Sequence, residues 1–199
     1  DPLWSRGLGD VYKRQDMKQR HGHLVESLSD LQDDIRLLVI GRVGEDSTRS
    51  AQSLGSQIEA IVRTIHRPTL ITTSHFRKPE TVMVAFDGSA TGHKTLQMLA
   101  SSPLCEGLPI HIVMVGTDSE DNQNALEKAR TTLASSGSLV HSEIRPGEVE
   151  STLHAYQAEH GIDLLVMGAY GHSRIRQFLI GSTTTTMLRT STVPLLLLR

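Results

Sequence analysis

Five short runs rich in valine, isoleucine and leucine recur in the C-terminal part of the chain, at residues 81–86, 110–116, 139–144, 164–167 and 194–198. Most of these runs are nearly continuous, which is typical of strands buried on both faces of a sheet. A strand with one solvated face would instead alternate apolar and polar residues. This part of the chain is therefore expected to build a largely parallel sheet.

The segments between these runs have helical periodicity, at residues 91–100, 121–134, 148–160 and 183–189. In the second of them, Leu126, Ala129 and Leu133 recur at the spacing of one helix face. Strands that alternate with helices predict an α/β fold, here a doubly wound five-stranded parallel sheet of the Rossmann-like kind. Right-handed crossovers favour the strand order 3-2-1-4-5, with the topological switch between the first and fourth strands.

An internal repeat divides the chain. The heptad IRLLVIG at 35–41 is matched by IDLLVMG at 162–168, and three shorter matches follow: 54–56 with 180–182, Arg63 with Arg189, and 68–71 with 194–197. We interpret residues 16–75 as the C-terminal part of a first domain, 76–80 as a linker, and 81–199 as a complete second domain. Residues 1–15 lack helical or strand periodicity, and we expect them to be either adaptor sequence or a disordered leader.

Charge and cysteine content exclude several classes of partner. The net charge is −2 with both signs interspersed, which provides no basic surface for nucleic acid or for an anionic membrane. No apolar run approaches the roughly 20 residues of a transmembrane helix. Cys105 is the single cysteine and cannot form an internal disulfide, so we expect a cytoplasmic protein.

Ligands of an open parallel sheet bind outside the carboxyl ends of its strands, at the switch point. Residues 87–89 (DGS) follow the first predicted strand and residues 168–171 (GAYG) follow the fourth; nine residues later, Gly181 and Ser182 open the last predicted helix. Glycines let backbone N–H groups approach a phosphate, and a helix N-terminus adds unpaired donors. The spacing indicates an anion-binding loop, although neither a Walker motif nor GxGxxG is present.

Each of these residues also has a purely structural interpretation. Ser182 and Thr183 can cap the last helix instead of donating to a phosphate. Gly168 and Gly171 can serve a tight turn, and Asp87 can form an Asx-turn after its strand. Taken one residue at a time, the sequence leaves both interpretations open.

Taken together, D-G-S after the first strand and G-x2-G-x9-G-[ST] after the fourth resemble the ATP-binding branch of the universal stress protein family. The resemblance covers residues 81–199 with every element in order, and residues 35–73 as a truncated copy. It implies that Asp87 and Val115 flank the adenine and ribose of ATP, and that Gly168, Gly171, Gly181 and Ser182 hold the phosphates. From the residues alone, Val115 could equally be an ordinary buried strand valine. His172 and Thr183 could also reach the phosphates, or His172 could face solvent and Thr183 cap the helix. Mg²⁺ would enter with the phosphates, because the sequence offers no dedicated cluster of metal ligands.

The truncated copy departs from this pattern. Gly44 and Gly55 are separated by ten residues, Glu45 and Asp46 would repel a phosphate, and the first strand with its aspartate is missing. We expect no nucleotide site there. The family resemblance implies pairing through last strands, either between residues 68–73 and 194–198 of one chain or in a homodimer. Because an isolated half-domain leaves sheet edge and core unsatisfied, we also expect residues 16–75 to be poorly packed or to recruit another chain.

The resemblance also implies a role in stress response, as a sensor or switch that binds ATP. No convincing base lies near Gly171 or Gly181, so we expect little or no turnover. Two alternatives stay open. One is a weak ATPase that uses His172 or Arg174, and the other is a structural or chaperone-like dimer that ignores nucleotide.

Overall fold

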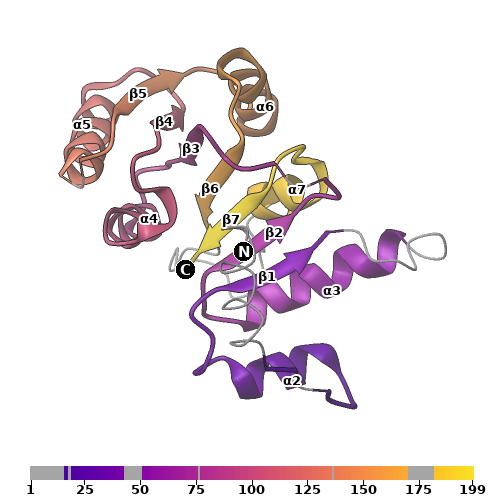
Figure 1. Ribbon diagram of the computed structural model, residues 1–199. Helices are drawn as coiled ribbons and strands as arrows, with labels where there is room; N and C mark the ends of the chain where they lie inside the picture. Colours follow the sequence, from indigo (N-terminus) through magenta and orange to yellow (C-terminus); the bar gives the residue numbers. More distant parts are fainter. Residues whose placement is uncertain (1–15, 18, 43–50, 76, 136, 170–181) are drawn as a thin grey trace, which may run out of the picture.

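The computed structural model describes residues 16–199 except 18, 43–50, 76, 136 and 170–181. Its strands form one sheet in the order β1-β2-β7-β6-β3-β4-β5 (Figure 1). The strands are β1 Leu38–Gly41, β2 Thr69–Thr72, β3 Val82–Ala85, β4 Ile110–Val115, β5 Val140–Arg145, β6 Leu164–Gly168 and β7 Leu195–Leu198. Neighbouring strands in the described sheet are parallel except β2 and β7, which run antiparallel.

Helices cover both faces of this sheet. The described helices are α2 Leu24–Leu31, α3 Ala51–Thr64, α4 Ala90–Ala100, α5 Glu120–Ala134, α6 Val149–His160 and α7 Ser182–Thr190, with a short 3-10 helix at Pro103–Cys105. Helices α4 and α5 pack on one face through a cluster that includes Leu96 and Leu126. Helices α3, α6 and α7 pack on the other face through a cluster that includes Val62 and Leu153. The α/β class with helices on both faces is therefore confirmed.

The order predicted for the five strands of the second repeat is confirmed. Numbered from β3 as the first strand of that repeat to β7 as the fifth, the observed order β5-β4-β3-β6-β7 is 3-2-1-4-5. The prediction of a five-stranded, wholly parallel sheet was incomplete. Strands β1 and β2 of the first repeat extend the sheet beyond β7 to seven strands. Their junction is antiparallel, with Leu70 opposite Leu196 and Ile71 opposite Leu195. The last strands of the two repeats thus pair within one chain.

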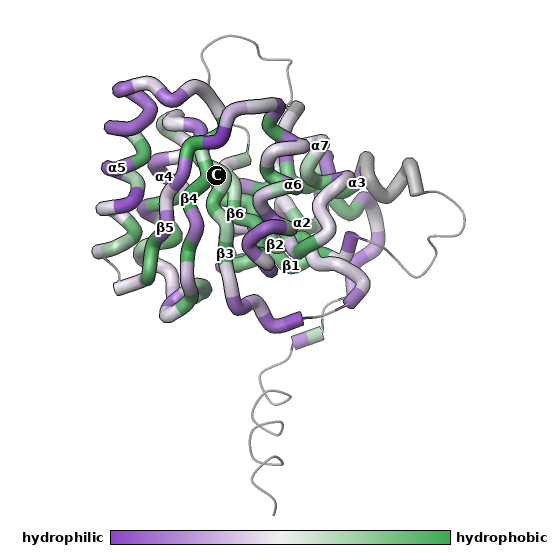
Figure 2. The backbone as a smooth tube through the Cα atoms, turned by 90° about the horizontal axis from the view of Figure 1, so that it is seen from above, coloured by the Kyte–Doolittle hydropathy of each residue, from purple (hydrophilic) through white to green (hydrophobic). Residues whose placement is uncertain are grey.

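Successive residues of the central strands alternate between the two faces, yet both sets are apolar. Val82 and Val84 face α4 and α5, whereas Met83 between them faces the α3, α6 and α7 side. Figure 2 shows the green, hydrophobic segments concentrated in the strands at the centre, with hydrophilic segments on the outer helices. In the described part of the chain, no helix has the length and apolar content needed to cross a membrane.

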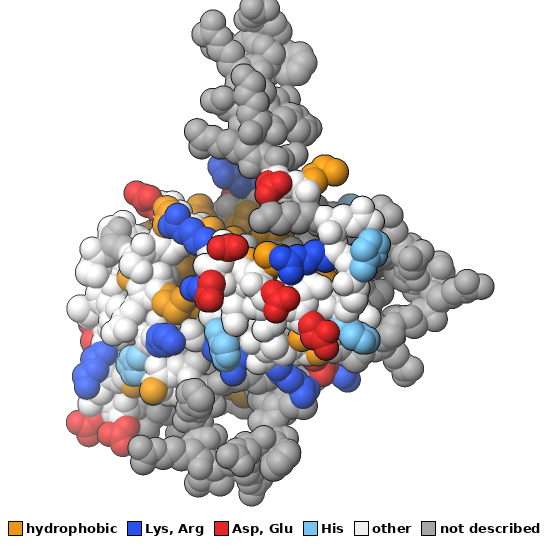
Figure 3. Space-filling view, turned by 90° about the horizontal axis from the view of Figure 1, so that it is seen from below, with side chains coloured by type: hydrophobic (Ala, Val, Ile, Leu, Met, Phe, Trp, Pro, Cys, Tyr) orange, Lys and Arg blue, Asp and Glu red, His pale blue; other side chains and the backbone are white. Residues whose placement is uncertain are grey.

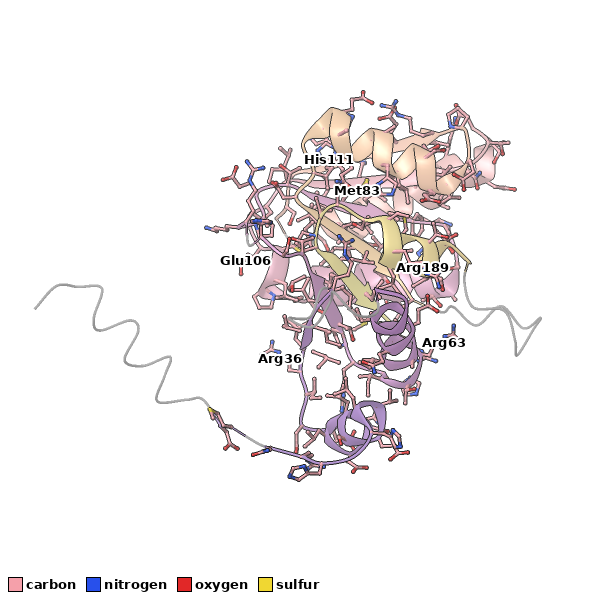
Figure 4. All side chains as sticks on the ribbon, turned by 90° about the vertical axis from the view of Figure 1, so that its right-hand side faces the viewer. Arg36, Arg63, Met83, Glu106, His111 and Arg189 are labelled. Atoms are coloured by element: carbon pink, nitrogen blue, oxygen red, sulfur yellow. The ribbon has the colours of Figure 1, made fainter. Side chains whose placement is uncertain are left out.

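The first repeat shares side-chain contacts with the second. Ile58, Val62 and Ile71 belong to the same buried cluster as Leu195 and Leu197 of β7. An ion-pair cluster lies beside it (Figure 4): Glu59 of α3 accepts from Arg63 at 3.3 Å and from Arg189 of α7 at 2.9 Å. Arg63 and Arg189 are the equivalent residues of the two repeats, so both repeats supply a cation to one carboxylate. The described part of the first repeat is therefore packed against the second, so the expectation that residues 16–75 are poorly packed is wrong for these described elements.

We predict that Ile71→Ala destabilises the whole sheet by about 2–5 kcal/mol, because it opens a cavity in a core that both repeats share. Ile71 is only 3% exposed. Val39→Ala is the matched control, since Val39 on edge strand β1 is 56% exposed and its truncation should change stability by less than about 0.5 kcal/mol. Urea unfolding measures both. Equal effects of the two variants would contradict a shared core.

Candidate functional site

The carboxyl ends of β3, β4 and β6 lie side by side at one end of the strands. Ala85 of β3 is in register with Met167 of β6 on one side and with Val113 of β4 on the other. Adjacent strands are about 4.8 Å apart, so the residues that follow these strands converge. Strand β3 pairs with β4 on one side and with β6 on the other, so the direction of winding reverses at β3. The structure therefore brings Asp87, Val115 and Gly168 to the predicted switch point.

Asp87 forms the Asx-turn that its sequence allows. Its Oδ1 accepts a hydrogen bond from the Ser89 N–H at 3.0 Å, and Gly88 between them has a φ of 72°, in the left-handed region that favours glycine. Ser89 in turn caps α4 by accepting from the Gly92 N–H at 3.0 Å. No described residue hydrogen-bonds to the other carboxylate oxygen, and Asp87 is exposed. The turn therefore holds the carboxylate in place and leaves one oxygen available.

Gly92 was missed from the sequence, although it sits inside the helix that follows this turn. A Cβ at this position would lie 2.8 Å from Asp87 Oδ1 and 3.0 Å from Phe86 Cδ2. Any side chain there would push against the carboxylate, so Gly92 lets α4 approach the Asp87 turn. The available signal was a lone glycine in a helical pattern, which often marks a close packing contact.

Gly168, at the end of β6, also permits a close approach by α4. A Cβ there would lie 3.0 Å from Thr91 Cγ2 and 3.2 Å from Thr95 Oγ1. The φ of Gly168 is not positive, so no left-handed backbone conformation requires a glycine here. A glycine is needed at this position because α4 packs closely against it. The neighbouring Thr95 Oγ1 is buried and has no hydrogen-bond partner in the described structure.

Val115 ends β4 half-buried and packs against the cluster that faces α3, α6 and α7. Thr183 lies in the first turn of α7, half-buried, and Ser182 is the first residue of that helix. Since α7 connects β6 to the parallel strand β7, its first turn belongs to the carboxyl side of the sheet. Gly171, His172 and Gly181 lie outside the described residues. The described geometry thus brings Asp87, Val115, Gly168 and the start of α7 to the same end of the strands.

Histidines that are scattered in the sequence gather near the other end of β4. The His111 ring lies 5.0 Å from that of His141 on β5 and 5.2 Å from that of His160 on α6, centroid to centroid. His111 Nδ1 is 2.9 Å from the hydroxyl of Tyr156, which stacks on His160 at 4.1 Å. Burial, and then the neighbouring His141 and His160, lower the pKa of His111, while Glu143 opposes the shift.

This histidine cluster was missed because its members come from three separate elements. Arg145 stands over the Tyr156 ring at 5.2 Å and forms ion pairs with Glu143 and Glu159. Within the described ranges, no group of three metal-ligating side chains has a geometry that could hold a metal ion.

The face of the molecule in Figure 3 carries both signs of charge interspersed.

The sequence matches the profile of the family described as the universal stress protein family over residues 79–199. The universal stress protein Slr1230 of Synechocystis sp. is 41% identical over 180 residues, covering 89% of this chain and 63% of that protein. The chain therefore spans less than two thirds of the length of this relative.

Solved structures share the fold at lower sequence identity. A universal stress protein from Archaeoglobus fulgidus has a TM-score of 0.71 at 20% identity, covering 98% of this chain and 75% of that one. A universal stress protein crystallised in complex with cAMP has a TM-score of 0.53 at 22% identity, covering 62% of this chain and 98% of that one. These likenesses extend the family match to the three-dimensional arrangement.

We predict that the protein loses stability as the pH falls below the ordinary histidine pKa of about 6.5. The folded-state pKa of His111 is lowered, so the unfolded chain binds its proton more readily. The contribution is complete above the unfolded pKa and is lost as the pH falls toward the folded value. His111→Gln should flatten this slope in urea titrations from pH 7.5 to 5.5. His21→Gln, at an exposed position near the chain start, should leave it unchanged; a shared response would refute the assignment.

Proposed function

The chain belongs to the universal stress protein family, and we propose that it binds ATP as a stress-response sensor or switch with little or no turnover. The observation that carries the proposal is the convergence of Asp87, Val115 and Gly168 at the switch point of the sheet. The glycine pattern that starts at Gly168 continues to Gly171 and Gly181 in the sequence. Carboxylate, apolar side chain and glycine loop are the three parts that an adenine nucleotide needs.

Each part has a distinct task in this proposal. The free carboxylate oxygen of Asp87 accepts hydrogen bonds from ribose hydroxyls, since its other oxygen is held by the Ser89 N–H. Val115 offers apolar contact to the adenine. Backbone N–H groups at Gly171 and Gly181, together with the hydroxyls of Ser182 and Thr183, bind the phosphates, helped by the positive end of the α7 dipole. His172 would lie beside them.

The residues present fit an adenine nucleotide better than they fit a resident metal. An exposed carboxylate that is oriented by a turn but has one free oxygen is suited to hydroxyl donors. The described part of the chain has no cluster of metal ligands, so Mg²⁺ would be bound mainly through the phosphates themselves. The related structure solved with cAMP supports an adenine nucleotide as the ligand class. The choice of a triphosphate rests on the resemblance of the G-x2-G-x9-G-[ST] pattern to the ATP-binding branch of the family.

A second candidate function is a structural or chaperone-like protein that does not use nucleotide. The pairing of β2 with β7 favours it, because this pairing and the core shared by the two repeats lie away from the switch point. A weak ATPase is the third, with His172 or Arg174 as the residues that would act on the phosphates. Asp87 is a poor base for water at the γ-phosphate, because the proposal places it at the ribose.

We predict that ATP with Mg²⁺ binds the parent chain in titration calorimetry. Asp87→Ala should weaken this binding at least about tenfold, because it removes the charge-assisted hydrogen bonds from the ribose hydroxyls to the carboxylate. Asp34→Ala is the control, since Asp34 is an exposed carboxylate of the first repeat far from the switch point in the fold. Replacing both Gly171 and Gly181 by valine should abolish ATP binding.

The outcomes separate the three candidates. No binding to the parent chain would leave the nucleotide-independent protein as the better account, with the glycines serving packing and turns. Steady phosphate release by the parent that disappears in His172→Ala or Arg174→Ala would establish the ATPase instead. Binding without release, lost in the glycine variant and retained in Asp34→Ala, is the expected result.

A further inference from the structure

A pocket of about 500 Å³ lies at the opposite end of the sheet from the switch point. The antiparallel junction creates it, because it sets the carboxyl ends of β1 and β2 beside the amino ends of β6 and β7. The residues that determine its chemistry come from four segments: Arg42 after β1, Thr73, His75 and Arg77 after β2, Asp163 before β6 and Thr192 before β7. The volume is within the range of small-molecule sites, roughly 300–1,000 Å³.

The acidic side chain of the pocket is already satisfied. Asp163 Oδ2 accepts from the Glu80 N–H at 3.1 Å, and Oδ1 lies 3.8 Å from Arg77 Nη1. The Asp163 side chain is 14% exposed, so the carboxylate faces protein partners more than the pocket opening. Arg77 balances its charge. The remaining charge of the lining is therefore positive.

Arg42 supplies that charge. It is half-buried, and its Nη1 donates to the backbone carbonyl of Ser191, which fixes the guanidinium against the end of α7. Among the residues that the structure describes, no carboxylate lies within ion-pair distance of Arg42. A guanidinium has five N–H donors in a planar fork, which suits the oxygens of phosphate and carboxylate. The printed contact uses one of these donors, on the Ser191 carbonyl, and an anionic ligand would accept from the others.

The rest of the lining suits an organic ligand. Ile162, Val193 and Pro194 contribute apolar surface beside the polar side chains. The hydroxyls of Thr73 and Thr192 are held by the protein: Thr73 Oγ1 donates to the His75 carbonyl at 3.0 Å, and Thr192 Oγ1 accepts from Gln157 Nε2 at 2.7 Å. The Thr192 hydroxyl therefore has its own proton left to donate.

We propose that this pocket binds a small organic anion, whose phosphate or carboxylate group pairs with Arg42 and whose apolar part rests on Ile162, Val193 and Pro194. The site is independent of the proposed nucleotide site, because the two lie at opposite ends of the strands. It is also a product of the repeat junction, since each repeat supplies part of the lining.

Phenyl phosphate and benzoate are suitable probes, titrated separately into the full chain and followed by calorimetry and by NMR shifts. We expect saturable binding of at least one, and the tighter probe identifies the charged group. Arg42→Gln should weaken binding at least tenfold. Arg36→Gln should change it less than twofold, since Arg36 is an exposed arginine of the same repeat, near β1 (Figure 4). Ser74→Trp fills the pocket rim without removing the Arg42 contact to Ser191, and should also weaken binding.

Three results would overturn the proposal. One is the absence of saturable binding by the parent chain, and another is an equal loss in Arg36→Gln and Arg42→Gln. Inorganic phosphate that binds as tightly as phenyl phosphate would exclude a role for the apolar wall. Asp87→Ala keeps the pocket intact, so probe binding that survives in this variant while ATP binding fails separates the two sites.

Discussion

The antiparallel pairing of β2 with β7 is the constraint on which the rest of the molecule depends. All four residues of β7 are leucines and all four are buried, so this strand needs covered faces and hydrogen-bonded partners on both edges. Strand β6 supplies one edge and β2 supplies the other. Helix α3 then packs beside α7, and Glu59 binds the equivalent arginines of both repeats. The incomplete first repeat is in this way built into the core of the complete one.

Strand polarity then places the two candidate sites. All strands of the second repeat point the same way, so their carboxyl ends converge on Asp87, Val115 and Gly168. Reversal of direction at the β2–β7 junction places the carboxyl ends of β1 and β2 at the other end of the sheet, where they meet Arg42 and Asp163. One end of the sheet is organised by glycines and a carboxylate, and the other by arginines. The chemistry of each end follows from the residues that adjoin the strand ends located there.

Much of this arrangement is predictable from the sequence. Apolar runs that alternate with helical segments led to the order of the five strands, and the order placed Asp87 next to Gly168. What the sequence could not show were contacts between elements without a shared spacing. Gly92 beside Asp87, Thr95 beside Gly168, and the three histidines around Tyr156 depend on how α4 and α6 lie on the sheet. Pairing of residues 68–73 with 194–198 within one chain was one of the two alternatives that the family resemblance implied, and it is confirmed. Its antiparallel direction was not predicted, because apolar strands carry no mark of the direction in which an added neighbour runs. Gly171, His172 and Gly181 stay predictions of the sequence.

The intrachain junction also has a consequence for mass action. Pairing between last strands of separate chains would weaken on dilution, because its population depends on protein concentration. Here both strands belong to one polypeptide and are joined through the residues between Thr72 and Leu195, so the second strand is always present at a high effective concentration. The extended sheet, and with it the pocket at the repeat junction, should therefore persist at dilutions at which a two-chain assembly would come apart.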